Sequence, residues 1–134
     1  MAASGSRASV QVEGAAELRR ALRRMDHSVS DLTKVNRKAA QPVYDRARDI
    51  VPRRSGRLAR SIKVRATART AHVQAGRTGV VPYAGPIHFG WRRRNIEPQP
   101  FLYGALDDRR QEVADVYANY VGDLVERLDG ETPG

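Results

Sequence analysis

The sequence predicts one small domain of mixed helices and short strands, in the order strand, helix, helix, three strands, extended arm and helix. Two periodicities lead to this prediction. Apolar residues recur every three or four positions in some segments, and they alternate with polar residues in shorter ones. A length of 134 residues suits a single domain, and neither an internal repeat nor a long linker divides it. We expect residues 9–128 to form this domain, flanked by flexible tails over residues 1–8 and 129–134.

The first segments predict a short strand and an amphipathic helix. Alternating valines over residues 9–13 predict the strand, which Gly14 ends. Over residues 15–25 one face is apolar and the other carries four arginines, a pattern typical of a surface helix. The apolar stripe of this helix consists of Leu18, Leu22 and Met25.

A second apolar stripe predicts a long helix that Pro52 ends. Ser28, with Asp31 three residues later, is a suitable helix start. Pro42 lies inside the helix and should kink it, or restart it as a first-turn proline. The stripe consists of Leu32, Val35, Ala39, Val43, Ala47 and Ile50.

Three short strands are expected next. Residues 61–67 and 71–75 both alternate between apolar and polar positions, and the short link over residues 68–70 predicts a hairpin. Residues 80–83 predict a third strand, which Pro82 limits.

The segment from Tyr83 to Pro100, which we call the arm, shows no periodicity. It is rich in proline and glycine and holds three consecutive arginines. Because aromatic residues are interleaved through it, we expect the arm to be extended but ordered. Residues 101–128 then keep a helical apolar period, and Asp107 and Asp108 near the start suit the helix dipole.

The formal charge of +9 is distributed unevenly. Residues 1–106 contain 21 basic and 7 acidic residues, whereas residues 107–134 contain 3 and 8. Between Ile50 and Ile96 there is no acidic residue at all. This asymmetry predicts an acidic partner or complementary contacts between copies.

The sequence offers no catalytic, cofactor-binding or metal site. Cysteine is absent, and His27, His72 and His88 fall in different predicted elements. No serine lies in a nucleophile motif, and no complete phosphate-binding loop is present. No apolar run is long enough to span a membrane. We therefore expect a protein that is not an enzyme, needs no cofactor and does not enter a membrane.

Composition and charge leave two classes of function open. A nucleic-acid-binding protein without sequence specificity would use the basic residues of the carboxylate-free region as a phosphate-facing surface, although no known DNA- or RNA-binding signature is present. A small, basic, toxin-like ribonuclease is the weaker alternative, because that region has no carboxylate to act as a general acid or base.

Two motifs stand out together. The first, over residues 51–62, combines a proline that stops a helix, a Ser-Gly turn or cap, an anchoring leucine and the start of a strand; its residues are Pro52, Ser55, Gly56, Leu58, Ser61 and Ile62. The second opens the arm with a Tyr-Ala pair and an aromatic-Gly pair, and closes it before the last helix; its residues are Tyr83, Ala84, Phe89, Gly90, Pro98, Pro100, Phe101, Leu102 and Ala105.

In order and spacing these motifs resemble those of the tail-completion, or head–tail joining, family of long-tailed bacteriophages. In that family P-x-x-[ST]-G-x-L-x-x-S-[IL] precedes Y-A-x-x-x-x-[FY]-G, and P-x-P-F-L-x-x-A follows. The resemblance covers residues 9–128. The chain departs from it at His88, where members often carry Glu, and in the strongly basic triplet Arg92–Arg94.

The resemblance implies a small α+β domain, in which an antiparallel sheet of three or four strands packs against the long kinked helix and the C-terminal helix, with the Pro/Arg-rich arm extended. It also implies a structural virion protein of a siphovirus, assembled in the host cytoplasm. Copies of the protein would form a homo-oligomeric ring in the neck of the virion. The resemblance implies a ring of six subunits. The ring would join the connector or stopper proteins of the DNA-filled head to the tail terminator or tail tube.

Site expectations follow from this interpretation. Partner contacts are expected in the arm, with its tryptophan as anchor, at Ile87, His88, Phe89, Trp91, Arg92, Arg93, Arg94 and Ile96. Contacts with DNA in the ring lumen, or with an acidic partner such as the C-terminal helix of an adjacent copy, are expected at Arg53, Arg54, Arg57 and Arg60. A structural role is expected for Pro52, Ser55, Gly56, Leu58, Tyr83, Gly90, Pro100 and Phe101.

Overall fold

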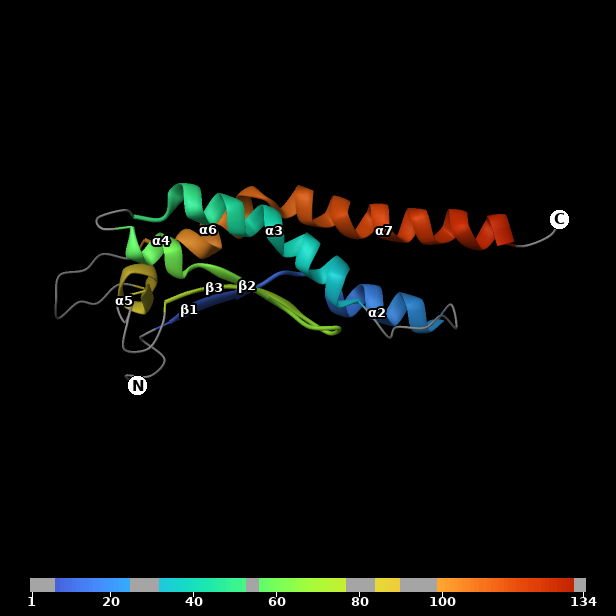
Figure 1. Ribbon diagram of the computed structural model, residues 1–134, viewed down its shortest axis with the longest axis horizontal. Helices are drawn as coiled ribbons and strands as arrows, with labels where there is room; N and C mark the ends of the chain where they lie inside the picture. The colour runs from blue at the N-terminus through green and yellow to red at the C-terminus, as the bar shows by residue number, and fades with distance from the viewer. Residues whose placement is uncertain (1–6, 25–31, 53–55, 77–83, 90–98, 132–134) are drawn as a thin grey trace.

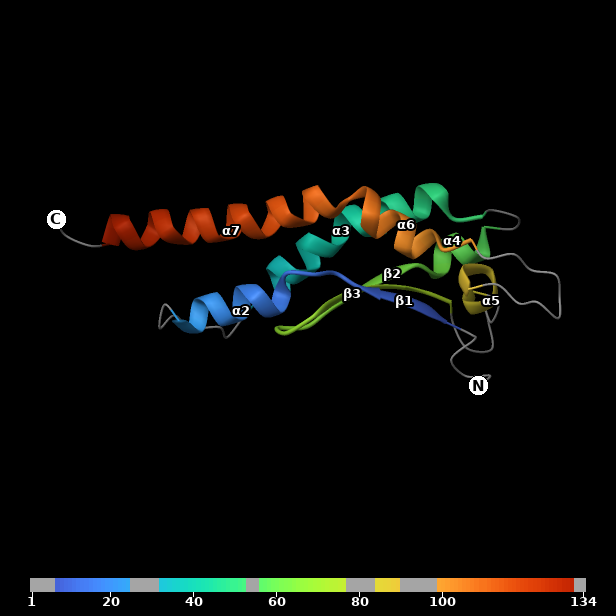
Figure 2. The same ribbon diagram turned by 180° about the vertical axis from the view of Figure 1, so that it is seen from behind.

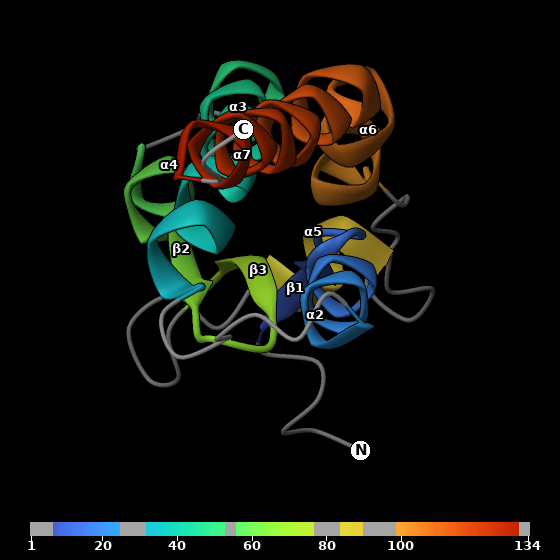
Figure 3. The same ribbon diagram turned by 90° about the vertical axis from the view of Figure 1, so that its right-hand side faces the viewer.

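Helices α3, α6 and α7 lie on one side of a three-stranded antiparallel sheet in the computed structural model, which confirms the predicted α+β class (Figures 1 and 3). The structure describes residues 7–24, 32–52, 56–76, 84–89 and 99–131. In chain order the elements are β1 (Ala8–Gln11), α2 (Ala15–Arg24), α3 (Thr33–Ile50), α4 (Arg57–Ser61), β2 (Lys63–Ala66), β3 (Ala71–Ala75), α5 (Ala84–Phe89), α6 (Phe101–Asp108) and α7 (Arg110–Glu131).

The sheet has the order β1-β3-β2, so the two strands of the predicted hairpin pair with each other and β1 joins the free edge of β3. The register places Val73 opposite both Val10 and Val64, which gives the sheet an apolar row across its inner face. Alternation therefore predicted these strands correctly. β2, however, begins at Lys63 and not at Ser61.

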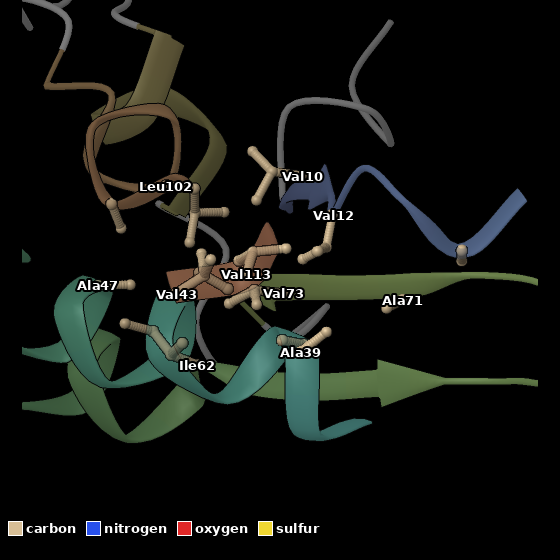
Figure 4. Close-up of a cluster of buried hydrophobic side chains, with 14 of the residues drawn as sticks. Val10, Val12, Ala39, Val43, Ala47, Ile62, Ala71, Val73, Leu102 and Val113 are labelled. Carbon is tan, nitrogen blue, oxygen red and sulfur yellow. The ribbon is translucent and has the colours of Figure 1, made fainter. Parts of the chain in front are cut away.

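The core lies between this apolar face and the helix layer. Figure 4 shows Val73 of β3 meeting Val43 of α3, Leu102 of α6 and Val113 of α7. The first three of these side chains are fully buried, and Val113 is 4% exposed. Burial of each such side chain contributes about 1.5–3 kcal/mol. Packing of α3 and α6 on the sheet is therefore the main stabilising feature of the domain.

Helix α3 continues through Pro42, which lies inside it, and Figure 1 shows the helix bending along its length. A proline in a helix interior removes one backbone hydrogen bond and bends the helix. The helix ends where predicted: Val51 is extended, at ψ 140°, because the following Pro52 disfavours the helical conformation. Its predicted start at Ser28 lies outside the described residues.

Three local predictions were wrong. Residues 57–61 form α4 where a turn and the start of a strand were expected, and Ala84–Phe89 form α5 within the supposedly aperiodic arm. The single helix predicted over residues 101–128 is divided at Arg109, which occupies the position where the apolar stripe would continue. The break is shallow, because the Arg109 N–H still donates to the carbonyls of Ala105 and Leu106.

Two further expectations fall on residues that the structure does not describe: the third strand over residues 80–83 and the place of Met25 in the first apolar stripe. Within the described ranges, no helix is both long and apolar enough to cross a membrane.

Candidate interaction surface

The end of α5 and the start of α6 lie side by side. The Gln99 N–H donates to the Ile87 carbonyl at 2.8 Å, and the Phe101 N–H donates to the Gln99 carbonyl at 2.8 Å. The chain therefore leaves α5 and returns to α6 beside the same backbone. Pro100 is the residue before the first turn of α6, where its missing N–H costs nothing.

Four rings gather at this base of the arm, and we call them the aromatic cluster: His88 and Phe89 of α5 with Phe101 and Tyr103 of α6. The ring of His88 stands edge-on to the other three, with centroid distances of 4.5 Å to Phe89, 5.2 Å to Phe101 and 4.6 Å to Tyr103. Phe89 and Tyr103 are 49% and 47% exposed, so the cluster presents two aromatic rings to solvent over a buried base.

His88 itself is fully buried, and its side chain is therefore part of the subunit interior. The partner contact that the sequence predicts for His88 would therefore have to be made by its neighbours on α5 and α6, over the buried ring. Burial lowers the pKa of His88 to about 4, so the ring is neutral at pH 7. Neither ring nitrogen has a hydrogen-bond partner in the part of the chain that the structure describes, which makes this buried ring costly.

The first motif of the sequence ties α4 to the end of the sheet. Gly56 precedes α4 with φ +80°, and a Cβ there would lie 2.9 Å from an Arg60 guanidinium nitrogen. Leu58 is buried. The Ser61 hydroxyl donates to the Leu58 carbonyl at 2.6 Å and accepts from the Gly76 N–H at 2.9 Å. These residues therefore connect α4 with the end of β3.

A buried polar network that the sequence analysis missed joins three elements. The Tyr117 hydroxyl of α7 donates to Asn36 Oδ1 of α3 at 2.9 Å, and Asn36 Nδ2 donates to the Thr67 carbonyl in the β2–β3 hairpin at 2.8 Å. Burial, with a smaller effect of the Glu17 carboxylate, raises the pKa of Tyr117 to about 12. The only sequence signal was an asparagine on the apolar stripe of α3.

The remaining predicted site residues are only partly placed. Arg57 and Arg60 are exposed on α4. The other predicted residues lie outside the described part of the chain: Arg53, Arg54, Ser55, Tyr83, Gly90, Trp91, Arg92, Arg93, Arg94 and Ile96. Among the residues that are described, no three His, Asp or Glu side chains gather closely enough to hold a metal ion.

Comparison with protein families matches residues 16–90 to the family described as "Bacteriophage HK97-gp10, putative tail-component". The match spans α2 to the end of α5 and includes the first motif and the sheet hairpin. The chain belongs to this HK97-gp10-like family of phage tail components, which makes it a structural protein of a phage virion. Comparisons with curated proteins and with solved structures gave no match.

Proposed function

We propose that copies of this protein form a closed ring in the neck of the virion, where the ring joins the connector of the DNA-filled head to the tail. Membership in a family of phage tail components supports a role in tail assembly. On this proposal the protein acts by assembly and not by catalysis. A ring needs a heterologous interface, in which one surface of each subunit meets a different surface of the next.

The aromatic cluster is the observation that carries this proposal. Phe89 and Tyr103 expose about half of their surface each, and their rings lie 6.0 Å apart. Aromatic side chains are enriched in protein interfaces, and they supply large contact area at low entropic cost. A rigid buried base under them, formed by His88 and Phe101, holds both rings in place before binding.

In the proposed ring, the arm adds to the interface that the aromatic cluster makes. The described residues on either side of positions 90–98 meet at the aromatic cluster, because the Gln99 N–H donates to the Ile87 carbonyl. A segment anchored at both ends can reach a neighbouring subunit while its base stays in register. We assign Trp91 and Arg92–Arg94 to that contact from the sequence, since Trp and Arg dominate binding hot spots. The partners are the adjacent copy, a connector or stopper protein and the tail terminator or tail tube.

The test replaces the two exposed rings, as Phe89→Ser together with Tyr103→Ser. We expect the purified variant to fold and stay monomeric under conditions in which the wild-type chain assembles, as measured by sedimentation. In infected cells that supply only the variant, we expect separate heads and tails in electron micrographs.

The matched control is Val125→Ser on α7, which also removes an exposed apolar side chain, 40% exposed, far along the chain from the cluster. Normal assembly of the control with failure of the cluster variant supports the proposal. Normal virions from the cluster variant would show that this surface does not form the joint.

A further inference from the structure

The face of the sheet that points away from the helices is polar and carries positive charge. The register aligns Arg65 with His72 and Lys63 with Gln74, and β1 adds two neutral polar residues to the same rows. The residues of this face are Ser9, Gln11, Lys63, Arg65, His72 and Gln74. None of these side chains is a carboxylate, and none is a large apolar group.

The hairpin tip and α2 continue this charge. Figures 1 and 3 place the tip of the β2–β3 hairpin beside α2, and Figure 2 shows the same pair from behind. Arg19 and Arg23 lie one turn apart on the same side of α2. Partial burial, then the positive charges of Arg23 and of Arg69 at the hairpin tip, lower the pKa of Arg19, in agreement with this placement. We call Arg19, Arg23, Lys63, Arg65 and Arg69 the basic face.

Of the carboxylates that the structure describes, the two that flank or lie on α2 are paired with other residues. Glu17 pairs with Arg20 at 3.5 Å and raises the pKa of Tyr117, so it lies toward α7. Glu13 pairs with Arg110 of α7 at 3.6 Å. Within the described residues, no member of the basic face forms an ion pair. The fold thus distributes five cations along the outer face of the sheet, the hairpin tip and α2, and their charge is left for an external anion.

We propose that the basic face binds the phosphate backbone of duplex DNA. Phosphate contacts require only cations and hydrogen-bond donors, which this face supplies, and they carry no sequence information. A protein partner would call for an apolar or aromatic anchor, and among the described residues that feature lies on the aromatic cluster. Figure 1 shows α5 and the hairpin tip at opposite ends of the sheet, so the part of the basic face on the hairpin tip and α2 lies away from the aromatic cluster.

The inference revises the expected DNA contacts from Arg53–Arg60 to the sheet and α2. It rests on the proposed function in one respect only: packaged DNA would reach this face because the protein forms a ring in the neck. Binding itself is a property of the subunit. DNA affinity and ring assembly are therefore measured separately, and either can fail without the other.

The experiment measures binding of the full chain to a mixed-sequence DNA duplex over a range of salt concentrations. If all five cations contact phosphates, log K falls against log salt with a slope of about −4.5. The test variant is Lys63→Gln with Arg65→Gln and Arg69→Gln. The slope should become shallower by about 2.7, and affinity at low salt should fall roughly tenfold or more.

The control is Lys34→Gln with Arg37→Gln and Lys38→Gln, which removes the same charge from exposed positions on α3. A second variant, Arg19→Gln with Arg23→Gln, tests the α2 part of the face in case the sheet variant does not fold. We expect both face variants to lose affinity and the control to keep the wild-type slope.

Three results would overturn the inference. One is an equal loss in the control, which would make the binding a matter of net charge. Another is wild-type affinity in both face variants. The third is unchanged DNA affinity with a lower assembled mass, which would assign this face to the acidic α7 of a second copy. Loss of DNA binding with a normal ring supports the inference, and failure of ring assembly alone would contradict only the proposed function.

Discussion

The hydroxyl of Tyr117 supports a polar network in an otherwise apolar interior. In Tyr117→Phe, Asn36 Oδ1 loses its donor while the amide stays buried. An unsatisfied buried acceptor costs about 1–3 kcal/mol, so we expect the free energy of unfolding to fall by that amount in urea denaturation. Tyr120→Phe is the control, because Tyr120 is half-buried on the same helix and makes no hydrogen bond to the residues described. Equal stability of the two variants would contradict the prediction.

The same residue predicts a loss of stability in alkali. The pKa of Tyr117 is about 12 in the folded chain against 10.0 when unfolded, because burial disfavours the phenolate. The contribution of the protonated Tyr117 hydroxyl to the free energy of unfolding is complete below pH 10.0. It declines as pH rises toward 12, because only the unfolded chain loses the proton in that range. The free energies of unfolding of the wild type and of Tyr117→Phe should therefore converge as pH rises from 10.0 to about 12. A constant difference between them over this range would contradict the raised pKa of Tyr117.

His88 predicts the opposite dependence, in acid. Its pKa is about 4 in the folded chain against 6.5 when unfolded, because burial disfavours the charged ring. The unfolded chain therefore binds a proton first as pH falls below 6.5, and stability declines down to about pH 4. His88→Phe keeps an aromatic ring and should flatten this part of the profile. His72→Gln, which removes a half-buried histidine from the sheet, is the control and should leave the His88 contribution in place.

At the scale of elements, Gly14 lets the chain before α2 pass close to Tyr117 of α7. Its φ is +124°, and a Cβ would lie 2.7 Å from the Tyr117 ring. Gly14→Ala therefore combines backbone strain with overpacking, and we expect a loss of about 1–3 kcal/mol in chemical denaturation. Gly122→Ala is the matched change on α7, where a Cβ meets nothing within 4 Å. It should stabilise the protein by about 0.5–1 kcal/mol, and a stabilising Gly14→Ala would refute the argument.

Elements with a clean apolar period could be predicted from sequence, and short helices without one could not. The alternation in Ala71–Ala75 and the stripe of α3 each repeat often enough to determine an element and its buried face. Helices α4 and α5 are each stabilised by tertiary contacts, such as the bonds of Ser61 and Ile87, which no local pattern encodes. The division of the last helix at Arg109 was also missed, because it occurs at a single polar residue within an otherwise regular apolar stripe.

The two candidate surfaces, too, could be predicted only in part from the sequence. Aromatic residues near the arm were expected at an interface, but burial of His88 and exposure of Phe89 depend on how α5 packs on α6. The basic face was missed for a related reason. Arg19 and Arg69 are distant in sequence, and their charges act on each other because the hairpin tip lies beside α2. Charge counting located the excess, but the fold determines which cations act together.

Across the whole molecule, a basic face and an acidic helix face lie on different elements. The sheet and α2 carry the basic face, whereas α7 exposes four carboxylates at helical spacing along one side: Glu112, Asp115, Asp123 and Glu126. This arrangement permits two kinds of ring. One is held by apolar contact at the aromatic cluster, and the other by attraction between the acidic helix and a neighbour's basic face.

The response of the ring to salt separates these two. Raising ionic strength from about 0.1 M to about 1 M shortens the Debye length from ~10 Å to ~3 Å and weakens exposed ion pairs, whereas apolar contacts persist. Because we assign the joint to Phe89 and Tyr103, we expect the assembled mass in sedimentation to stay constant over this range. DNA affinity of the same sample should fall steeply, because that contact is electrostatic. A ring that dissociates to monomers as salt rises would place the acidic face of α7 in the joint and remove the aromatic cluster from it.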